Sequence, residues 1–239
     1  MLVVAVLLGL AILVIAAIQI WGGEHYAAWL REHALPALQA IDYPPAAIVL
    51  SLRGSDPFLA ECLQRLSQQD YPQFEIHVIV DHPTDPARAV VEAWIREHPE
   101  PPLQLSFLEE RSEYAYLKTS AVRQAVLGLE ASVEVVVLAD ADTLVSQRWL
   151  QAMVTPLLAG AVGVVTGNRW YDPNIAGWGS LVRYIYNGAC MVPMLFMQAV
   201  WGGSLAMRRE VFATPVFADR MLDTPTEEAA IQDAMRSAG

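Results

Sequence analysis

The chain has 239 residues, which suits one sizeable domain plus an appendage at the usual ~100–200 residues per domain. It carries 26 acidic and 15 basic residues, a net charge of −11 at pH 7, and no block of Lys or Arg. This balance argues against a nucleic acid partner, which needs a basic patch.

Residues 1–20 (MLVVAVLLGLAILVIAAIQI) carry no charge, and a helix of that length spans about 30 Å, the thickness of a bilayer's hydrocarbon core. A cleaved signal peptide is the alternative. However, no Lys or Arg precedes the apolar run, no small-x-small cleavage site follows it, and Trp21 stands where an interfacial aromatic would. We predict a membrane anchor over residues 1–22, then a juxtamembrane helix and linker over residues 23–44. Arg31 favours a cytoplasmic location for the rest of the chain.

From residue 45 onward, apolar runs of strand length alternate with amphipathic segments of helix length. The strands are expected at 46–52, 74–80, 103–107, 133–139 and 161–167, and the helices at 58–66, 87–95, 117–129 and 147–159. This alternation indicates βαβ units, and therefore a mostly parallel, Rossmann-like α/β sheet with helices on both faces. We predict one domain over residues 45–239.

Polar residues follow these strands at their carboxyl ends, where ligands bind in such sheets. They are Ser51, Arg53, Gly54, Asp81, Arg111, Lys118, Asp140 and Asp142. The chain has neither a G-x-G-x-x-G dinucleotide fingerprint nor a G-x-x-x-x-G-K phosphate loop. Arg53 and Lys118 could neutralise a diphosphate or could be solvated surface charges. Asp81 could accept a hydrogen bond from a nucleoside or could be an ordinary turn residue.

Asp140 and Asp142 admit two interpretations. In an extended segment, side chains at i and i+2 project to the same side, so the pair could hold one Mg²⁺ or Mn²⁺ through oxygen ligands. Alternatively, one of the two caps a turn. The position behind a core strand strengthens the metal interpretation but leaves both interpretations open.

Two further features leave alternatives open. Residues 181–201 are strongly apolar with Arg183 as the only charge, which fits either a membrane-facing amphipathic helix or a buried core helix. Cys62 and Cys190 fit two buried thiols better than a disulfide.

Taken together, these motifs form an ordered series. It runs Arg53-Gly54, Gln69-Asp70-Tyr71-Pro72, Val80-Asp81 with Asp85-Pro86 downstream, Lys118, Asp140-Ala141-Asp142, and Gly202-Gly203-Ser204-Leu205-Ala206-Met207-Arg208-Arg209. In this series the chain resembles family 2 glycosyltransferases, and most closely the ceramide glucosyltransferase-like branch with its hopanoid-type relatives. The resemblance covers roughly residues 45–239. Each motif alone is weak, but the ordered series is specific.

The resemblance implies a glycosyltransferase A-type fold that binds a nucleotide sugar. Asp81 would contact the nucleoside, and Asp140 and Asp142 would bind the ribose and the metal on the diphosphate. Lys118 would lie near the nucleotide, although Tyr116 replaces an Asn that is common in the family. The remaining residues of the site would be Ser51, Arg53 and Gly54 for the nucleotide sugar, and Trp201, Gly202, Gly203 and Ser204 on the acceptor side.

Inverting sugar transfer also needs a carboxylate base for the acceptor hydroxyl. The family pattern of an acid followed by Asp aligns Glu227 and Glu228 there, so Glu228 is the expected base, with Asp223 as a second candidate. The longer Glu side chain shifts its carboxylate by about 1 Å, and acids in a first helical turn also complement the helix dipole. The family's Gln/Arg-x-x-Arg-Trp motif does not occur before Gly239, which raises the prospect of a truncated chain or a complementing C-terminal fragment.

We therefore expect a membrane-anchored, inverting, metal-dependent enzyme. It would move a hexose from a nucleotide diphosphate sugar, UDP-linked, to a hydroxyl group of a lipid. The alternatives are a non-catalytic nucleotide-sugar-binding remnant and a processive polysaccharide synthase.

Overall fold

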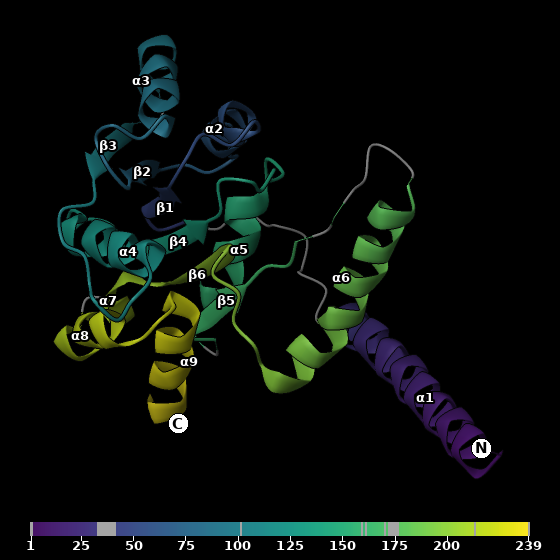
Figure 1. Ribbon diagram of the computed structural model, residues 1–239. Coiled ribbons are helices and arrows are strands. Elements are labelled where there is room, and N and C mark those ends of the chain that lie inside the picture. The colour runs from purple at the N-terminus through teal and green to yellow at the C-terminus, as the bar shows by residue number, and fades with distance from the viewer. Residues whose placement is uncertain are drawn as a thin grey trace. The chain divides into compact units, whose positions relative to one another are not determined.

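The computed structural model describes residues 2–32, 42–100, 102–158, 160, 162–169, 171, 177–212 and 214–238. The chain divides into two compact units (Figure 1). The helical unit comprises residues 1–36 and 170–199, and the sheet unit comprises residues 37–169 and 200–239.

The sheet unit is built on six strands in the order β3-β2-β1-β4-β6-β5. Four of them are mutually parallel: β1 (Ala46–Leu52), β2 (Phe74–Val80), β3 (Leu103–Phe107) and β4 (Val135–Ala139). β6 (Ser204–Arg208) runs antiparallel to β4, and β5 (Val164–Thr166) runs antiparallel to β6 at the edge. The central strands are apolar on both faces, as a sheet covered by helices on both sides requires.

Helices cover both faces of this sheet, and each face has its own core. One core combines Ile48 and Leu50 of β1 with side chains of α2 (Leu59–Ser67), α3 (Ala87–Glu97) and α5 (Trp149–Leu158). The other combines Ala47 and Val49 with α4 (Leu117–Gly128), α7 (Arg209–Phe212), α8 (Pro215–Asp223) and α9 (Glu227–Ala238). Alternate residues of one strand thus face opposite helical layers.

The parallel strands and the helices between them lie where the sequence predicts them. The far edge of the sheet differs. The segment Ser204–Arg208, for which no strand is expected and of which only Ser204 is expected on the acceptor side, is strand β6. It separates β4 from β5. The strand expected at 161–167 is shorter and pairs antiparallel with β6 rather than next to β4.

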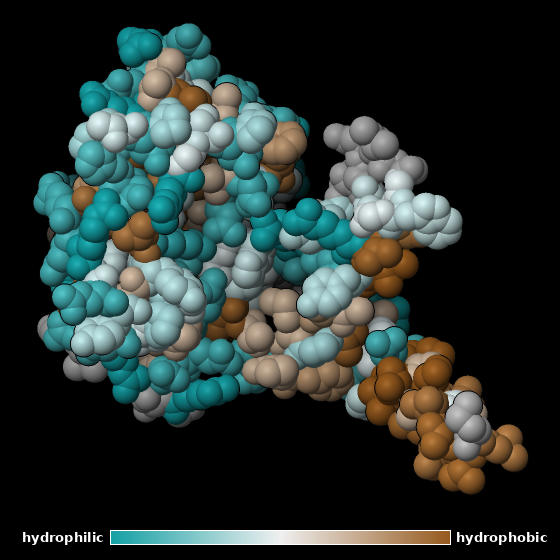
Figure 2. Space-filling view, in the orientation of Figure 1, coloured by the Kyte–Doolittle hydropathy of each residue, from teal (hydrophilic) through white to brown (hydrophobic). Residues whose placement is uncertain are grey.

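The helical unit consists of α1 (Leu2–Glu32) and α6 (Trp178–Met197). α1 is long and apolar enough to cross a membrane, with none of its most apolar window buried, and its surface is a brown zone in Figure 2. It runs without a break through the boundary expected at residue 22. Of the juxtamembrane helix and linker expected over 23–44, residues 33–41 lie outside the described part of the chain.

α6 corresponds to the apolar segment expected over 181–201. Its interpretation as a buried core helix is wrong, because Met191 is the one buried residue in α6. It packs on α1 where Gly22 meets Val192; a Cβ added at Gly22 would lie 2.7 Å from Val192 Cγ1. The rings of Trp21 and Phe196 stack next to this contact, with centroids 5.7 Å apart.

Candidate functional site

A cavity of about 480 Å³ lies at the carboxyl ends of β1, β2 and β4, beside the start of α4. This is the edge at which parallel α/β sheets bind ligands. The cavity brings together five of the residues expected to bind a nucleotide sugar. Its lining consists of Ser51, Leu52, Arg53, Ile79, Asp81, Leu108, Ala115, Tyr116, Leu117, Lys118, Ala121 and Asp140.

Gly54, the sixth expected residue, does not line this cavity but shapes the loop beside it. Its φ of +80° is a conformation that other residues rarely adopt. Its N–H donates to both carboxylate oxygens of Asp85, at 3.1 and 2.9 Å. Asp85 Oδ1 also accepts the N–H of Ala87 at the start of α3, at 2.8 Å. Gly54 and Asp85 therefore fix the loop that carries Arg53.

Asp81 forms one wall of the cavity, next to two guanidinium groups. Its Oδ1 lies 2.8 Å from Arg111 Nη2 and its Oδ2 lies 3.6 Å from Arg53 Nε. Arg111 also donates to the backbone carbonyl of Asp81 at 2.7 Å. The sequence places Arg111 at this edge without a role; the structure makes it the closest cation to Asp81. The wall can thus present an acid to a nucleoside and positive charge to phosphates.

Lys118, in the first turn of α4, links two acids from distant segments. Its Nζ lies 2.8 Å from Asp140 Oδ1 and 2.7 Å from Glu227 Oε1. Burial lowers the pKa of Lys118, but the charges of Glu227 and Asp140 outweigh burial and raise the pKa above its ordinary value. Lys118 is therefore a permanent cation at the cavity wall.

Glu227, which the family pattern places directly before the expected base, is a further acid at this site. Its side chain is 3% exposed, and its Oε2 accepts a hydrogen bond from Thr119 Oγ1 at 3.1 Å. A buried carboxylate held by a lysine and a hydroxyl is positioned to orient its neighbours. Its position directly before Glu228 was a sequence signal for this site. Its pairing with Lys118 could not be predicted, because that contact depends on how the chain folds.

Asp140 and Asp142 bind different cations. Arg169 Nη1 lies 2.8 Å from both carboxylate oxygens of Asp142, whereas Asp140 binds Lys118. The expectation that both side chains leave an extended segment on the same side is not met. β4 ends at Ala139, and Thr143 N–H donates to the Asp140 carbonyl at 3.2 Å, closing a turn.

This turn is held from the other face by Cys62. The Cys62 thiol donates to the Asp140 carbonyl oxygen at 3.7 Å, and burial raises the pKa of Cys62 to about 12. Both Cys62 and Cys190 are free, as expected, although only Cys62 is fully buried.

The residues around the turn supply some of the ligands that a divalent cation needs. Within the described ranges, no group of three or more His, Cys, Asp or Glu side chains could hold a metal. Mg²⁺ at a nucleotide, however, is typically bound by one or two carboxylates together with substrate phosphates. Each carboxylate of this pair already has a cationic nitrogen within 2.8 Å, so the place accommodates positive charge. The residue types therefore fit such a cation.

The start of β6 connects this acid pair with the expected base. Gly203 C=O accepts the N–H of Asp140 at 3.1 Å, and Gly202 N–H donates to Glu228 Oε1 at 3.1 Å. A Cβ at Gly203 would collide with the Trp201 ring and the Asp140 carboxylate. A Cβ at Gly202 would come within 2.7 Å of Glu228 Oε1. Only glycines let the strand approach both acids this closely.

Two other expected residues lie next to these glycines in the chain, and the second candidate for the base lies on α8. Trp201 is half-buried, and Ser204 is buried, with its Oγ accepting a hydrogen bond from Trp149 Nε1 at 2.9 Å. Asp223, the second candidate for the base, is exposed at the end of α8. Glu228 is half-buried in the first turn of α9 and, through Gly202, is the candidate base that contacts the site.

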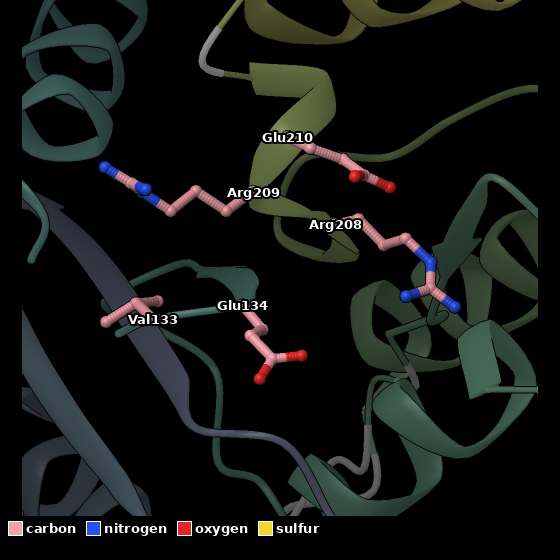
Figure 3. A pocket seen from close by; sticks show the side chains of 5 residues that line it. All are labelled: Val133, Glu134, Arg208, Arg209 and Glu210. Atoms are coloured by element: carbon pink, nitrogen blue, oxygen red, sulfur yellow. The ribbon is translucent and has the colours of Figure 1, made fainter. Parts of the chain in front are cut away.

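A second cavity, of about 200 Å³, lies at the opposite end of β4 and is lined by Val133, Glu134, Arg208, Arg209 and Glu210. Figure 3 shows the side chains of Arg208 and Arg209 extending in opposite directions. Arg208 donates to the Leu157 carbonyl at 2.9 Å, and Arg209 donates to the Leu129 carbonyl at 3.1 Å. Both carbonyls lie at the C-terminal ends of helices, where arginines satisfy free acceptors. The two arginines that line this cavity therefore have structural roles at helix ends.

The model of the family described as Glycosyl transferase family 21 matches residues 1–214. The chain belongs to this family. A "Ceramide glucosyltransferase" from Komagataella phaffii (strain GS115 / ATCC 20864) is 44% identical over 52 residues, which are 22% of this chain and 10% of that protein. These matches confirm the resemblance to the ceramide glucosyltransferase-like branch that the ordered motifs predicted.

Solved structures share the fold of this family 21 chain. The mannosyltransferase PcManGT from Pyrobaculum calidifontis, in complex with GDP-Man and Mn²⁺, has a TM-score of 0.55 at 23% identity, over 82% of this chain and 55% of that one. TarS from S. aureus has a TM-score of 0.52 at 16% identity, over 78% and 53%. The 4-diphosphocytidyl-2C-methyl-D-erythritol synthase from Anaerococcus prevotii has a TM-score of 0.53 at 9% identity, over 82% of both chains.

These likenesses confirm the predicted α/β fold of the glycosyltransferase A type. At such low identity they establish the fold alone. The chain spans about half the length of the PcManGT and TarS structures and a tenth of the curated relative.

Proposed function

We propose that the chain is a membrane-anchored, inverting glycosyltransferase. It moves a hexose from a nucleotide diphosphate sugar, UDP-linked, to a hydroxyl group of a lipid. The observation that carries this proposal is the pair of backbone hydrogen bonds made by Gly202 and Gly203. There, the wall of the cavity expected to bind the nucleotide sugar (Asp140) and the expected base (Glu228) bond to adjacent glycines in the turn before β6.

The donor half of the site rests on the distribution of charge around the larger cavity. Asp81 offers an acceptor for a nucleoside, while Arg53, Arg111 and Lys118 supply positive charge for a diphosphate. Arginine suits phosphate oxygens because its planar fork donates two parallel hydrogen bonds, whereas lysine acts as a point charge. A nucleotide diphosphate sugar has both of the groups that this wall can recognise.

A divalent cation held by Asp140 and Asp142 would neutralise charge on the leaving diphosphate. Mn²⁺ is a suitable probe, since it accompanies the sugar nucleotide in the archaeal mannosyltransferase structure. Lys118, bound to Asp140 at 2.8 Å, adds a fixed positive charge at the same wall.

Glu228 is the residue proposed to act on the acceptor. Its carboxylate would accept the proton of the acceptor hydroxyl as that oxygen attacks the anomeric carbon, and the nucleoside diphosphate would leave from the opposite side. One displacement of this kind inverts the anomeric centre. The hydrogen bond from Gly202 N–H to Glu228 Oε1 orients the carboxylate. Positioned general bases contribute about 10²–10⁴-fold to rate.

The lipid acceptor is supported by the helical unit and by the similarity to a ceramide glucosyltransferase. α1 is a candidate membrane span. α6 exposes large apolar side chains, among them Trp178, Val182, Ile185 and Tyr186, and contains a single charged residue, Arg183. The stacked Trp21 and Phe196 rings mark the part of α1 where interfacial aromatics are expected. We infer that α6 lies on the bilayer, with the sheet unit on the cytoplasmic side.

The proposal is tested by following radiolabelled UDP-glucose into extracted lipids, using the full chain in membranes with Mn²⁺. We expect labelled lipid with the wild type and losses of about 100-fold or more with Asp142→Ala and Glu228→Gln. Glu134→Gln, which changes an acid in the second cavity, serves as the control and should leave labelling unchanged.

Other outcomes of this experiment identify the alternatives. Binding of the nucleotide without any turnover would indicate a non-catalytic remnant, or a chain that needs a complementing fragment. Label in an insoluble polymer rather than in lipid would indicate a processive synthase. Equal labelling by the wild type and both variants would contradict the assigned site.

A further inference from the structure

Arg169 follows the edge strand β5 and is the cation bound to Asp142. Its Nη1 lies 2.8 Å from both carboxylate oxygens, so one guanidinium nitrogen engages the whole carboxylate. The Arg169 side chain is 26% exposed and that of Asp142 is 51% exposed. This pair occupies the oxygens that the proposed function assigns to a divalent cation.

The Trp201 ring supports Arg169 in this place. Its guanidinium carbon lies 5.0 Å from the centroid of the Trp201 ring, within the range of a cation–π interaction. The Trp201 backbone is in turn fixed by Thr166 of β5, whose Oγ1 accepts the Trp201 N–H at 3.0 Å. An ordinary surface ion pair lacks such an aromatic support.

We propose that Arg169 is the internal counter-ion of Asp142, which a divalent cation must displace in order to bind. The inference rests on the metal pair of the proposed function. Arg169 Nη1 lies where a cation bound by both oxygens of Asp142 would lie, so the free energy of the ion pair is subtracted from the free energy of metal binding there. Arg169 thereby sets the metal affinity of the site and keeps Asp142 paired when no metal is bound.

The test is binding of Mn²⁺ to the purified full chain in detergent at a fixed concentration of UDP, because such a cation is held by carboxylates together with nucleotide phosphates. Binding is measured from the electron paramagnetic resonance signal of free Mn²⁺. We expect Arg169→Ala to bind Mn²⁺ about fivefold more tightly than the wild type, since a supported ion pair of about 1 kcal/mol no longer competes. Arg169→Gln, which keeps most of the side chain, should shift the affinity in the same direction and provides a second variant if the alanine variant does not fold.

The matched control is Arg148→Ala. Arg148 is also paired with an aspartate, Asp70, at 4.0 Å, but on the exposed surface. Its loss changes the net charge equally and should leave Mn²⁺ affinity at the wild-type value. Asp142→Ala should abolish the tight binding in either background.

Unchanged or weaker Mn²⁺ binding by both Arg169 variants would overturn the inference. If lipid labelling nevertheless depends on Asp142, the proposed function survives and only the role of Arg169 fails. If neither the wild type nor the Arg169 variants bind Mn²⁺, the metal pair and this inference are both wrong.

Discussion

At the residue scale, Lys118 decides how three charged groups coexist at the cavity wall. Glu227 is almost fully buried, and its Oε1 lies 2.7 Å from the Lys118 ammonium nitrogen. Asp140 receives a second hydrogen of the same ammonium group. The sequence could assign Lys118 to the nucleotide from its place in the motif series. It could not reveal the pairing with Glu227, because that contact joins α4 to α9 through the fold.

Replacing Lys118 by Met should destabilise the protein by about 2–4 kcal/mol, because Glu227 is left as an unpaired buried charge. Urea unfolding at pH 7 measures this change. The double variant Lys118→Met/Glu227→Gln should recover part of the loss, because the amide carries no charge to compensate. Equal stability of the single variant and the wild type would contradict the buried ion pair.

The stability difference between the wild type and Lys118→Met depends on pH in a defined direction. The pKa of Lys118 is raised in the folded protein, so its contribution is fully present below the ordinary value of about 10.4 and is lost as pH rises through the folded value. The Lys118 part of the stability difference should therefore stay constant between pH 7 and 9.

At the element scale, β6 is where the sequence-based account and the structure differ most. The parallel strands were predictable because apolar runs of strand length alternate with amphipathic helices. Ser204–Arg208 is also a short apolar run, but it follows Gly202-Gly203, and the motif series indicated a substrate-lining segment. Its antiparallel pairing with β4 depends on long-range contacts that local periodicity does not contain.

Substituting Gly203 by Ala tests the close approach of β6 to the site. The added methyl group would collide with the Trp201 ring and the Asp140 carboxylate, so both must shift. We expect a destabilisation of about 1–3 kcal/mol together with a loss of sugar transfer. Gly128→Ala is the control, because a Cβ there meets no atom within 4 Å. A Gly203→Ala variant with wild-type stability and activity would rule out the packing described.

At the scale of the whole molecule, the fold class and family followed from the order of motifs along the chain. The cavity residues could be predicted because carboxyl ends of parallel strands share an edge. The contact between Arg169 and Asp142 could not, since it depends on how the segment after β5 returns to the turn after β4. The helical unit was foreseen as two apolar segments, but not the packing of Gly22 against Val192.

If α1 is an uncleaved membrane anchor, the intact chain should behave as an integral membrane protein. Full-length protein should remain in the membrane pellet after an alkaline carbonate wash, and its intact mass should include residues 1–20. A mass lacking these residues would establish a cleaved signal peptide instead. Release of the intact chain by the wash would show that α1 does not span the bilayer.

The central claim is that the cavity at the carboxyl ends of β1, β2 and β4 binds the nucleotide of a sugar donor. Calorimetric titration of UDP into the full chain with Mn²⁺ tests it most directly. Asp81→Asn should weaken UDP binding about tenfold or more, because it replaces one acceptor oxygen at the cavity wall by an NH2 donor and removes the carboxylate that orients Arg53 and Arg111. Glu134→Gln, in the second cavity, should bind UDP like the wild type. UDP binding that is insensitive to Asp81→Asn but weakened by Glu134→Gln would contradict the account.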